Sequence, residues 1–322
     1  SKYDESLEDN SIYEEVFNGE EAPIFPHDLP TLTALNGKGI IKSTPFGNSL
    51  TKDLAVAAIK GEGLGEDDFT DLLAVSFSST DYVGHQFGAD SKETQDTYLR
   101  LDRDLADFLD FLEQRIGTEN VLVFLTADHG AVRTPSYLKD RKIPAGYFEA
   151  EEPVAKLKVY LDSLYGVGSW VKTYGNAQLF LNRELIAEKT LRLEVVQQQV
   201  ADFMLGFKGV QKAVTGRTLE RSEFTSGVLA SLQRGYNPKR SGDVLLVLDP
   251  AWIEYSHTGT THGSGYIYDQ HVPLIWYGWK VKQGSTNKRI AVTDIAASIS
   301  NLLGISFPNG SSANVIALPV NE

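Results

Sequence analysis

Cysteine is absent from this sequence of 322 residues. The absence excludes disulfides and metal sites built on thiolates. A run of about 20 apolar residues is also missing, so the sequence predicts no transmembrane helix. Positive charge is scarce, because 30 Lys and Arg residues stand against 43 Asp and Glu residues, for a formal net charge of −13. Nothing supplies a basic stripe, which argues against nucleic acid or an anionic membrane surface as the main partner. An anionic substrate would therefore need a local positive centre, and bound cations would provide one.

The remaining composition, with 42% apolar and 23% charged residues, is ordinary for a globular protein with a large core. We predict three parts. Residues 1–42 form an acidic, proline-containing lead-in that is loosely held over its first 21 residues. Residues 43–133 and 257–322 form a partial α/β core domain that carries the metal-binding motifs. Residues 134–256 form an inserted α/β subdomain, because strand-like and helix-like segments alternate there.

The core domain is predicted from one strand–helix–strand pattern. Residues 72–77 are apolar and indicate a central strand, residues 92–116 show helical spacing of apolar side chains, and residues 121–125 indicate a second strand. Such a unit is a right-handed crossover between parallel strands. We therefore expect a mostly parallel sheet with helices on both faces, and ligands in such sheets bind beyond the carboxyl ends of the strands.

Further elements follow from the same patterns. A short helix is expected at 50–60, a return strand at 271–278, and a final helix that begins at Thr293 and ends at Gly304. In the inserted subdomain we expect helices and strands in alternation, at 153–165, 177–181, 191–205, 210–215, 220–232 and 243–248.

Five side chains at the ends of these strands suggest a metal site. Asp81 and His85 follow the first strand and are four residues apart, so one helical turn can aim both at one ion. His262, in a Gly/Thr/Ser-rich loop, would complete a set of one carboxylate and two imidazoles, which suits catalytic zinc. Asp128 and His129 follow the second strand, and they can face the same pocket if the chain leaves strand geometry there, which Gly130 would permit. Two ions about 3.5–4 Å apart could clamp both oxygens of a displacement at phosphorus.

Each motif also has an ordinary structural alternative. Asp81 with His85 could be a helix cap with a surface histidine, Asp128–His129 an ordinary turn, and His262 an exposed loop residue. The joint pattern is more specific than any one of its parts. The other three histidines, His27, His257 and His271, do not belong to such a motif, although His257 could line the pocket. The acidic face of the long helix is expected to be solvated; it comprises Asp102, Asp104, Asp107 and Asp110.

The motifs resemble those of the alkaline phosphatase superfamily, most of all its branch of exported phosphatases and type I phosphodiesterases/nucleotide pyrophosphatases. The resemblance lies in Ser79–Gly88, Thr126–Gly130 and Thr261–Gly263, and it extends to Val292–Ala296 before Leu302–Gly304. It implies two zinc ions, one held by Asp81, His85 and His262 and the other in part by Asp128 and His129. It also implies an exported protein, periplasmic or secreted, that acts on a small phosphate ester.

One part of the family pattern is missing. Family members carry, upstream of the first motif, a strand that ends in a further metal-binding Asp and then a Thr or Ser nucleophile. Nothing before Leu72 resembles that block, and Thr44 is expected to be only a turn residue. We therefore expect a C-terminal portion of a longer enzyme, with one complete and one partial metal site and little activity alone.

Several functional alternatives stay open on the sequence. A phosphomonoesterase is favoured, and a phosphodiesterase or nucleotide pyrophosphatase is the nearest rival. A sulfatase-like or phosphoglycerate-mutase-like enzyme is less favoured, because an imidazole-rich ligand set prefers zinc to calcium or manganese. A binding module that kept the fold and lost the chemistry is the alternative outside the enzymes. The sequence carries no signal for an oligomeric state.

Overall fold

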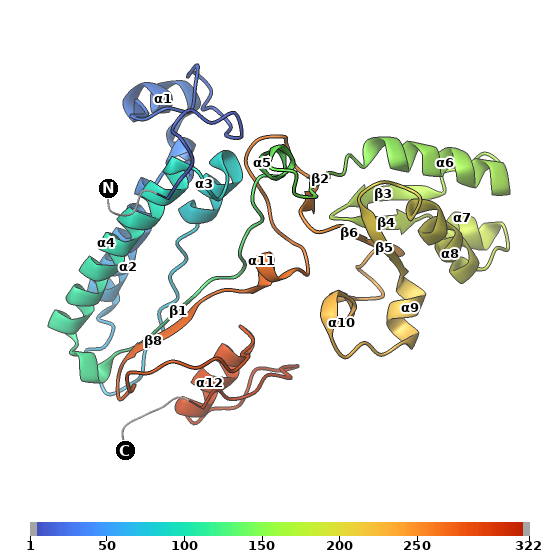
Figure 1. Ribbon diagram of the computed structural model, residues 1–322. Helices are drawn as coiled ribbons and strands as arrows, with labels where there is room; N and C mark the ends of the chain where they lie inside the picture. The colour runs from blue at the N-terminus through green and yellow to red at the C-terminus, as the bar shows by residue number, and fades with distance from the viewer. Residues whose placement is uncertain (1–4, 318–322) are drawn as a thin grey trace.

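The computed structural model describes residues 5–317 and has an α/β architecture with two bodies joined by extended segments (Figure 1). The long helices lie in the first body, and a four-stranded sheet with its covering helices forms the second. The first body contains α1 (Leu29–Asn36), η1 (Lys38–Ser43), α2 (Phe46–Glu62), α3 (Ser79–Phe87), α4 (Lys92–Arg115) and η2 (Thr118–Asn120). The connecting region contains β1 (Leu122–Thr126), α5 (Pro135–Asp140), β2 (Gly146–Tyr147), β7 (Trp252–Ile253), α11 (Ile267–Gln270) and β8 (Leu274–Gly278). Helix α12 (Asp294–Leu302) follows near the C-terminal end and does not link the two bodies (Figure 1).

The second body contains α6 (Glu151–Tyr165), β3 (Val171–Gly175), β4 (Gln178–Leu181), α7 (Arg183–Glu188), α8 (Leu193–Met204), β5 (Val210–Thr215), α9 (Gly216–Arg221), α10 (Gly227–Gly235) and β6 (Val244–Leu248). Its sheet has the strand order β3-β4-β6-β5, and every pair in it is antiparallel. Helices α6 and α8 bury Leu157, Leu161 and Val200 against this sheet, so the body has its own hydrophobic core. The elements predicted at 153–165, 177–181, 191–205, 210–215 and 243–248 are confirmed, while the boundaries 134–256 of the subdomain stay a prediction.

The single helix predicted at 220–232 is wrong, because the chain forms α9 and α10 with a break between them. Phe224 lies in the break and packs against the cluster that contains Leu219, and Gly227 at the start of α10 has a φ of 72°. Gln233 holds the break in place: its side-chain amide donates to Leu219 O at 2.7 Å, and its Oε1 accepts from Phe224 N at 2.9 Å. Side-chain hydrogen bonds to the carbonyls of a helix end replace the partners that the helix lacks there.

Helix α4 confirms the prediction for residues 92–116. The Ser91 hydroxyl accepts from Thr94 N at 3.0 Å and caps its first turn. One residue of its acidic face departs from the prediction, since Asp104 is only 9% exposed. Its carboxylate accepts from the Ser49 hydroxyl at 2.7 Å and lies 3.4 Å from Lys52 Nζ. Asp104 therefore joins α4 to α2 by a partly buried ion pair instead of facing solvent.

The strand predicted at residues 72–77 is not formed, and this is the main correction to the predicted fold. Residues 71–77 carry no helix or strand, and Leu72 is 68% exposed. Strand β1 pairs only with β8, antiparallel, with Phe124 opposite Trp276. The return strand and the strand at 121–125 are thus confirmed, but the parallel crossover is absent from residues 5–317. A strand needs a hydrogen-bonded neighbouring strand. Within residues 5–317, residues 72–77 make no backbone–backbone hydrogen bond.

The lead-in is packed more firmly than predicted. Phe17 and Leu32 are 6% and 2% exposed and lie against Val83 and Phe87 of α3. His27 is held between two glutamates, one near it in the sequence and one far from it: Nδ1 lies 3.0 Å from Glu20 and Nε2 lies 3.2 Å from Glu93. Within residues 5–317, no helix is long and apolar enough to cross a membrane.

Candidate metal centre

Helix α3 supplies the first two side chains of the centre. Asp81 lies in its first turn, where the helix dipole favours a negative charge, and His85 follows in its last turn on the same face. His85 Nε2 lies 3.3 Å from Asp81 Oδ2. Val83 and Phe87 pack this helix against Phe17 and Leu32. At the start of the helix, Asn48 Oδ1 accepts a hydrogen bond from Ser79 N at 3.2 Å.

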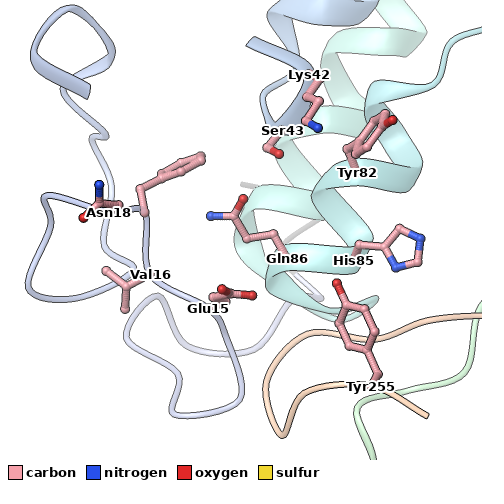
Figure 2. A pocket seen from close by; sticks show the side chains of 10 residues that line it. Glu15, Val16, Asn18, Lys42, Ser43, Tyr82, His85, Gln86 and Tyr255 are labelled. Atoms are coloured by element: carbon pink, nitrogen blue, oxygen red, sulfur yellow. The ribbon is translucent and has the colours of Figure 1, made fainter. Parts of the chain in front are cut away.

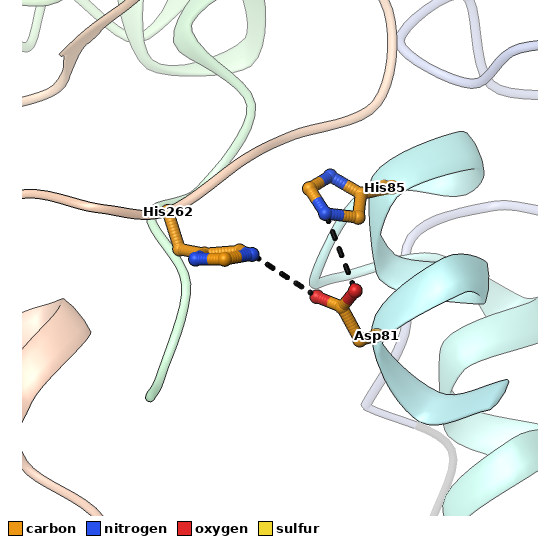
Figure 3. A group of neighbouring side chains, drawn as sticks. All are labelled: Asp81, His85 and His262. Atoms are coloured by element: carbon orange, nitrogen blue, oxygen red, sulfur yellow. Dashed lines mark ion pairs between the residues drawn. The ribbon is translucent and has the colours of Figure 1, made fainter. Parts of the chain in front are cut away.

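The loop before His262 is joined to the end of this helix. Gly259 has φ +67°, and a Cβ there would lie 1.9 Å from His85 O, so only glycine fits. Thr260 N donates to His85 O at 3.2 Å, and the Thr260 hydroxyl donates to Val132 O at 2.5 Å. These contacts join Thr260 to His85 across 175 positions of sequence, and they bring His262 to α3. Its Nε2 lies 3.4 Å from Asp81 Oδ1, on the side of the carboxylate away from His85 (Figure 3).

His129 reaches the same place from the segment after β1, and Asp128 lies beside it. The strand ends at Thr126, so these two neighbours are free of strand geometry, as the prediction required. His129 Nε2 lies 3.6 Å from Asp128 Oδ2 and 3.9 Å from Asp81 Oδ1, and its ring stacks on His262 with centroids 3.3 Å apart. The Asp128 side chain is 90% exposed.

Gly130 has a different role from the one predicted. It does not have positive φ. A Cβ at this position would lie 2.2 Å from Tyr268 O, and Gly130 N donates to Asp269 O at 2.8 Å. The glycine is therefore needed for the close approach of two backbones, which draws the segment after β1 to the segment after His262.

Two backbone carbonyls select the nitrogen that each imidazole presents. His85 Nδ1 donates to Thr260 O at 2.8 Å, and His129 Nδ1 donates to Gly130 O at 2.9 Å. With a proton on Nδ1 of each ring, Nε2 is the nitrogen that faces the Asp81 carboxylate and is left to bind a cation. Metal-binding histidines in proteins are commonly oriented in this way.

The charges in the cluster support the same arrangement. Burial opposes the ionisation of Asp81, but its hydrogen bond to His85 and the neighbouring imidazoles lower its pKa below the usual value. The hydrogen bond to Asp81 raises the pKa of His85, against the effect of burial. Burial lowers the pKa of His262, and the neighbouring His129 adds to this effect. His262 is thus held neutral beside an ionised carboxylate, which is the protonation state in which both bind a cation.

The donor set fits zinc. One ligand atom each from Asp81, His85 and His262 can be chosen so that all three lie within 4.8 Å of one another. Ligand atoms about 2.1 Å from a tetrahedral zinc ion are about 3.4 Å apart, close to the 3.3 and 3.4 Å found between the carboxylate and the two imidazoles. Three protein ligands leave one position of the tetrahedron for a substrate or water.

The other residues considered from the sequence lie outside the cluster. The His257 ring stacks on Tyr147, with its Nε2 3.4 Å from Glu149, and it does not line the cavity beside His85. Thr44 is 4% exposed and its hydroxyl donates to Ile41 O at 2.8 Å, as expected of a turn residue. Sequence reasoning missed Tyr255, whose ring lies 5.5 Å from that of His85, and Thr260, which holds His85 in place.

The fold and the site together define the class of protein. The chain matches the type I phosphodiesterase / nucleotide pyrophosphatase family over residues 18–271 and belongs to that family. The resemblance to the alkaline phosphatase superfamily is thereby confirmed.

Individual relatives agree with this class. The chain is 44% identical over 321 residues to a protein named calcium-transporting ATPase from Myroides odoratus, with 98% of the chain and 58% of the relative covered. It is 38% identical over 323 residues to alkaline phosphatase PafA from Elizabethkingia meningoseptica, with 100% of the chain and 58% of the relative covered. A crystal structure of wild-type alkaline phosphatase PafA superimposes with a TM-score of 0.91 at 38% identity, covering 98% of this chain and 60% of that one. The chain thus spans less than two thirds of these relatives.

Proposed function

We propose that this chain carries the zinc-binding face of a phosphoester hydrolase that acts on small phosphomonoesters. The main support is that side chains from three segments of the chain come together. Asp81, His85 and His262 form one group, and His129 and Asp128 lie beside it. Relatives at 38% identity or more include a protein named as an alkaline phosphatase, and their shared fold supports the same chemistry here.

In this proposal Asp81, His85 and His262 hold one zinc ion, and Asp128 and His129 contribute to a second. Bound zinc ions would supply positive charge beside the phosphoryl group, which the net charge of the chain does not. Zinc is favoured over calcium and manganese, because three of the five donors are imidazole nitrogens.

Neighbouring groups of the chain orient the side chains that would bind zinc. The carbonyl oxygens of Thr260 and Gly130 fix the rings of His85 and His129 through their Nδ1 protons. Asp81 stands between the imidazoles and provides the negative charge that a cation needs at this point. The attacking hydroxyl is proposed to be a Thr or Ser outside these 322 residues, as the family resemblance implies. The isolated chain is then expected to show little or no turnover of p-nitrophenyl phosphate.

Zinc binding is the direct test. The chain is stripped with a chelator and titrated with zinc in competition with a chromophoric chelator. We expect tight binding by the unchanged chain and a loss of at least about 100-fold in the variants Asp81→Asn and His262→Ala. The control is His271→Ala, since His271 is exposed and outside the cluster. Equal zinc affinity in all four proteins would remove the basis of the proposal.

A phosphodiesterase is the second candidate, and it is favoured by the match to the type I phosphodiesterase family. Parallel assays of the parent protein with p-nitrophenyl phosphate and bis-p-nitrophenyl phosphate decide between the two. A higher kcat/KM for the monoester supports a phosphatase, and a higher kcat/KM for the diester supports a phosphodiesterase.

Export to the periplasm or beyond is proposed from the family resemblance. Fractionation of cells that produce the parent protein, followed by detection with an antibody to this chain, would test it. Recovery in the cytoplasmic fraction alone would contradict export.

A further inference from the structure

Asp269 is a buried carboxylate near the candidate metal centre that does not belong to the ligand set. It lies in α11 and is 4% exposed. Its Oδ2 accepts from Gly263 N at 3.1 Å and from Ser264 N at 2.7 Å. These are the first two backbone N–H groups after His262. Hydrogen bonds to a carboxylate are about twice as strong as those between neutral groups, so Asp269 fixes the loop at the point where it carries His262.

The backbone of Asp269 holds the other imidazole segment of the cluster. Gly130 N is the first N–H group after His129, and it donates to Asp269 O at 2.8 Å. The side chain and the main chain of one residue thus bind the residues that follow His129 and His262. These two rings stack with their centroids 3.3 Å apart. Asp269 therefore links the two segments that bring the rings together.

Two tyrosines anchor the segment that carries Asp269. The Tyr266 hydroxyl donates to Leu248 O at 2.7 Å, and the Tyr268 hydroxyl accepts from Ala251 N at 3.1 Å. Leu248 is the last residue of β6, so this segment is attached to the end of a strand of the four-stranded sheet. A residue that orients a metal ligand must itself be held rigidly, and Asp269 meets this condition.

His262 depends on such support more than the other two imidazoles do. His85 Nδ1 and His129 Nδ1 each donate to a backbone carbonyl, and the His85 ring also lies 5.5 Å from the Tyr255 ring (Figure 2). Among residues 5–317, His262 Nδ1 has no hydrogen-bond partner. The direction of the His262 ring is therefore set by the loop that carries it and by the stack with His129.

One oxygen of Asp269 has no partner of its own. Asp269 Oδ1 is buried and accepts no hydrogen bond within residues 5–317. A buried carboxylate oxygen without a partner destabilises a fold. Burial and the neighbouring His129 lower the pKa of His262, whereas the charges of Asp81 and Asp269 raise it, so Asp269 lies within electrostatic reach of that ring. A cation bound at the ligand cluster would offset part of the cost of burying Asp269.

We propose that Asp269 is a positioning residue of the metal centre. Its carboxylate holds the loop after His262 and its carbonyl holds the segment after His129, so that the two imidazoles keep the spacing of the ligand cluster. Asp269 itself binds neither the ion nor the substrate, and its carboxylate acts through His262. The inference rests on the proposed zinc-binding function and adds to it a residue outside the ligand set.

Zinc affinity of the full chain, measured by competition with a chromophoric chelator, tests this role. We expect Asp269→Ala to bind zinc about 10-fold to 100-fold more weakly, the range for residues that orient metal ligands. Asp269→Asn should keep most of the affinity, because its amide oxygen can accept from the same two N–H groups. In the His262→Ala background, Asp269→Ala should lower the affinity by less than about twofold further, since there is no imidazole left to position.

The matched control is Asp294→Ala. Asp294 is also a buried carboxylate, 9% exposed, and it accepts from the backbone N–H groups of Ala291 and Asn314, but it lies outside the ligand cluster. We expect this variant to lose stability in urea unfolding and to keep its zinc affinity. Urea unfolding with a chelator present also shows whether Asp269→Ala is folded. If it is not, Asp269→Ser takes its place, because serine is polar but its side chain is one bond shorter.

Equal zinc affinity of the unchanged chain and Asp269→Ala overturns the positioning role and leaves the zinc site standing. An equal loss in the His262→Ala background, or in Asp294→Ala, also overturns it, because the effect would then be one of general stability. If the unchanged chain binds no zinc, the hydrolase proposal fails and the positioning role fails with it.

Discussion

Glu14 lies outside the metal centre and gives the stability of this chain a strong dependence on pH. Its side chain is 4% exposed, and neither of its carboxylate oxygens has a hydrogen-bond partner among residues 5–317. It faces Glu93, also 4% exposed, whose Oε1 lies 3.2 Å from His27 Nε2 while its Oε2 has no partner in the same range. Burial, followed by the charge of Glu93, raises the pKa of Glu14 from 4.5 to about 8.

The sign of the effect follows from proton linkage. The folded chain binds the Glu14 proton more tightly than the unfolded chain, so the stabilisation is complete below the unfolded pKa of 4.5. It is lost as the pH rises from there through about 8. One pKa unit corresponds to about 1.4 kcal/mol, so the full change is about 5 kcal/mol. That is a large part of the roughly 5–15 kcal/mol by which a domain is usually stable.

The variant Glu14→Gln removes this dependence, because the amide has nearly the shape of the protonated acid and is neutral at every pH. Urea unfolding at intervals from pH 5 to pH 9, with a chelator present to remove metal effects, gives the free energy of unfolding of both proteins. We expect the unchanged chain to lose about 3–5 kcal/mol relative to the variant over this range. At pH 9 the variant is then the more stable protein.

The matched control is Glu223→Gln, at an exposed glutamate in the break between α9 and α10. This variant should follow the unchanged chain within about 0.5 kcal/mol at every pH. Parallel pH curves for the unchanged chain and Glu14→Gln would show that Glu14 is ionised or solvated in the folded state, and the reasoning would be refuted.

Three further substitutions test the framework around the metal centre. Gly259→Ala places a Cβ against His85 O at a position with positive φ, so thermal unfolding should show a loss of about 2–4 kcal/mol, and the chelator competition assay a weaker zinc site. Asn48→Ala removes the side chain that caps α3, and a loss of about 1 kcal/mol in urea unfolding is expected. Lys52→Met leaves the buried carboxylate of Asp104 without its cation and should destabilise by about 2–4 kcal/mol. The double variant with Asp104→Leu should recover most of that loss, and equal stability of the single and double variants would contradict the pairing.

The sequence predicted the clustering of Asp81, His85 and His262 better than the sheet beside it. Asp81 and His85 are four residues apart, and Asp128 and His129 follow a strand, so each pair is placed by local geometry that a sequence displays. His262 alone could be an exposed loop residue, and it could be added only because the three motifs together are more specific than any one of them. What the sequence did not display is the way this loop is held, since Gly259 and Thr260 act through the backbone of His85.

Long-range charge pairing was the other part that sequence patterns missed. Asp104 falls on the polar face of an amphipathic helix, and nothing near it in the sequence indicates that it will contact Lys52 and Ser49 of α2. His27 likewise contacts Glu93, which is 66 positions away in the sequence. Periodicity separates apolar from polar faces, but it carries no information on which polar residue will meet a partner when two helices pack.

Residues 72–77 show the limit of reading a strand from composition. Their apolar run is what a strand buried on both faces would have, yet Leu72 and Leu73 are 68% and 38% exposed. An apolar composition indicates that a segment would be stabilised by burial of its side chains. A strand also needs backbone donors and acceptors on a neighbouring strand. The candidate metal centre does not depend on that pairing, because α3 is held by Val83 and Phe87 against the lead-in and by Asn48 from α2. The position of Asp81 and His85 is therefore set by helix packing, and this is why the cluster forms although the strand before it has no partner within residues 5–317.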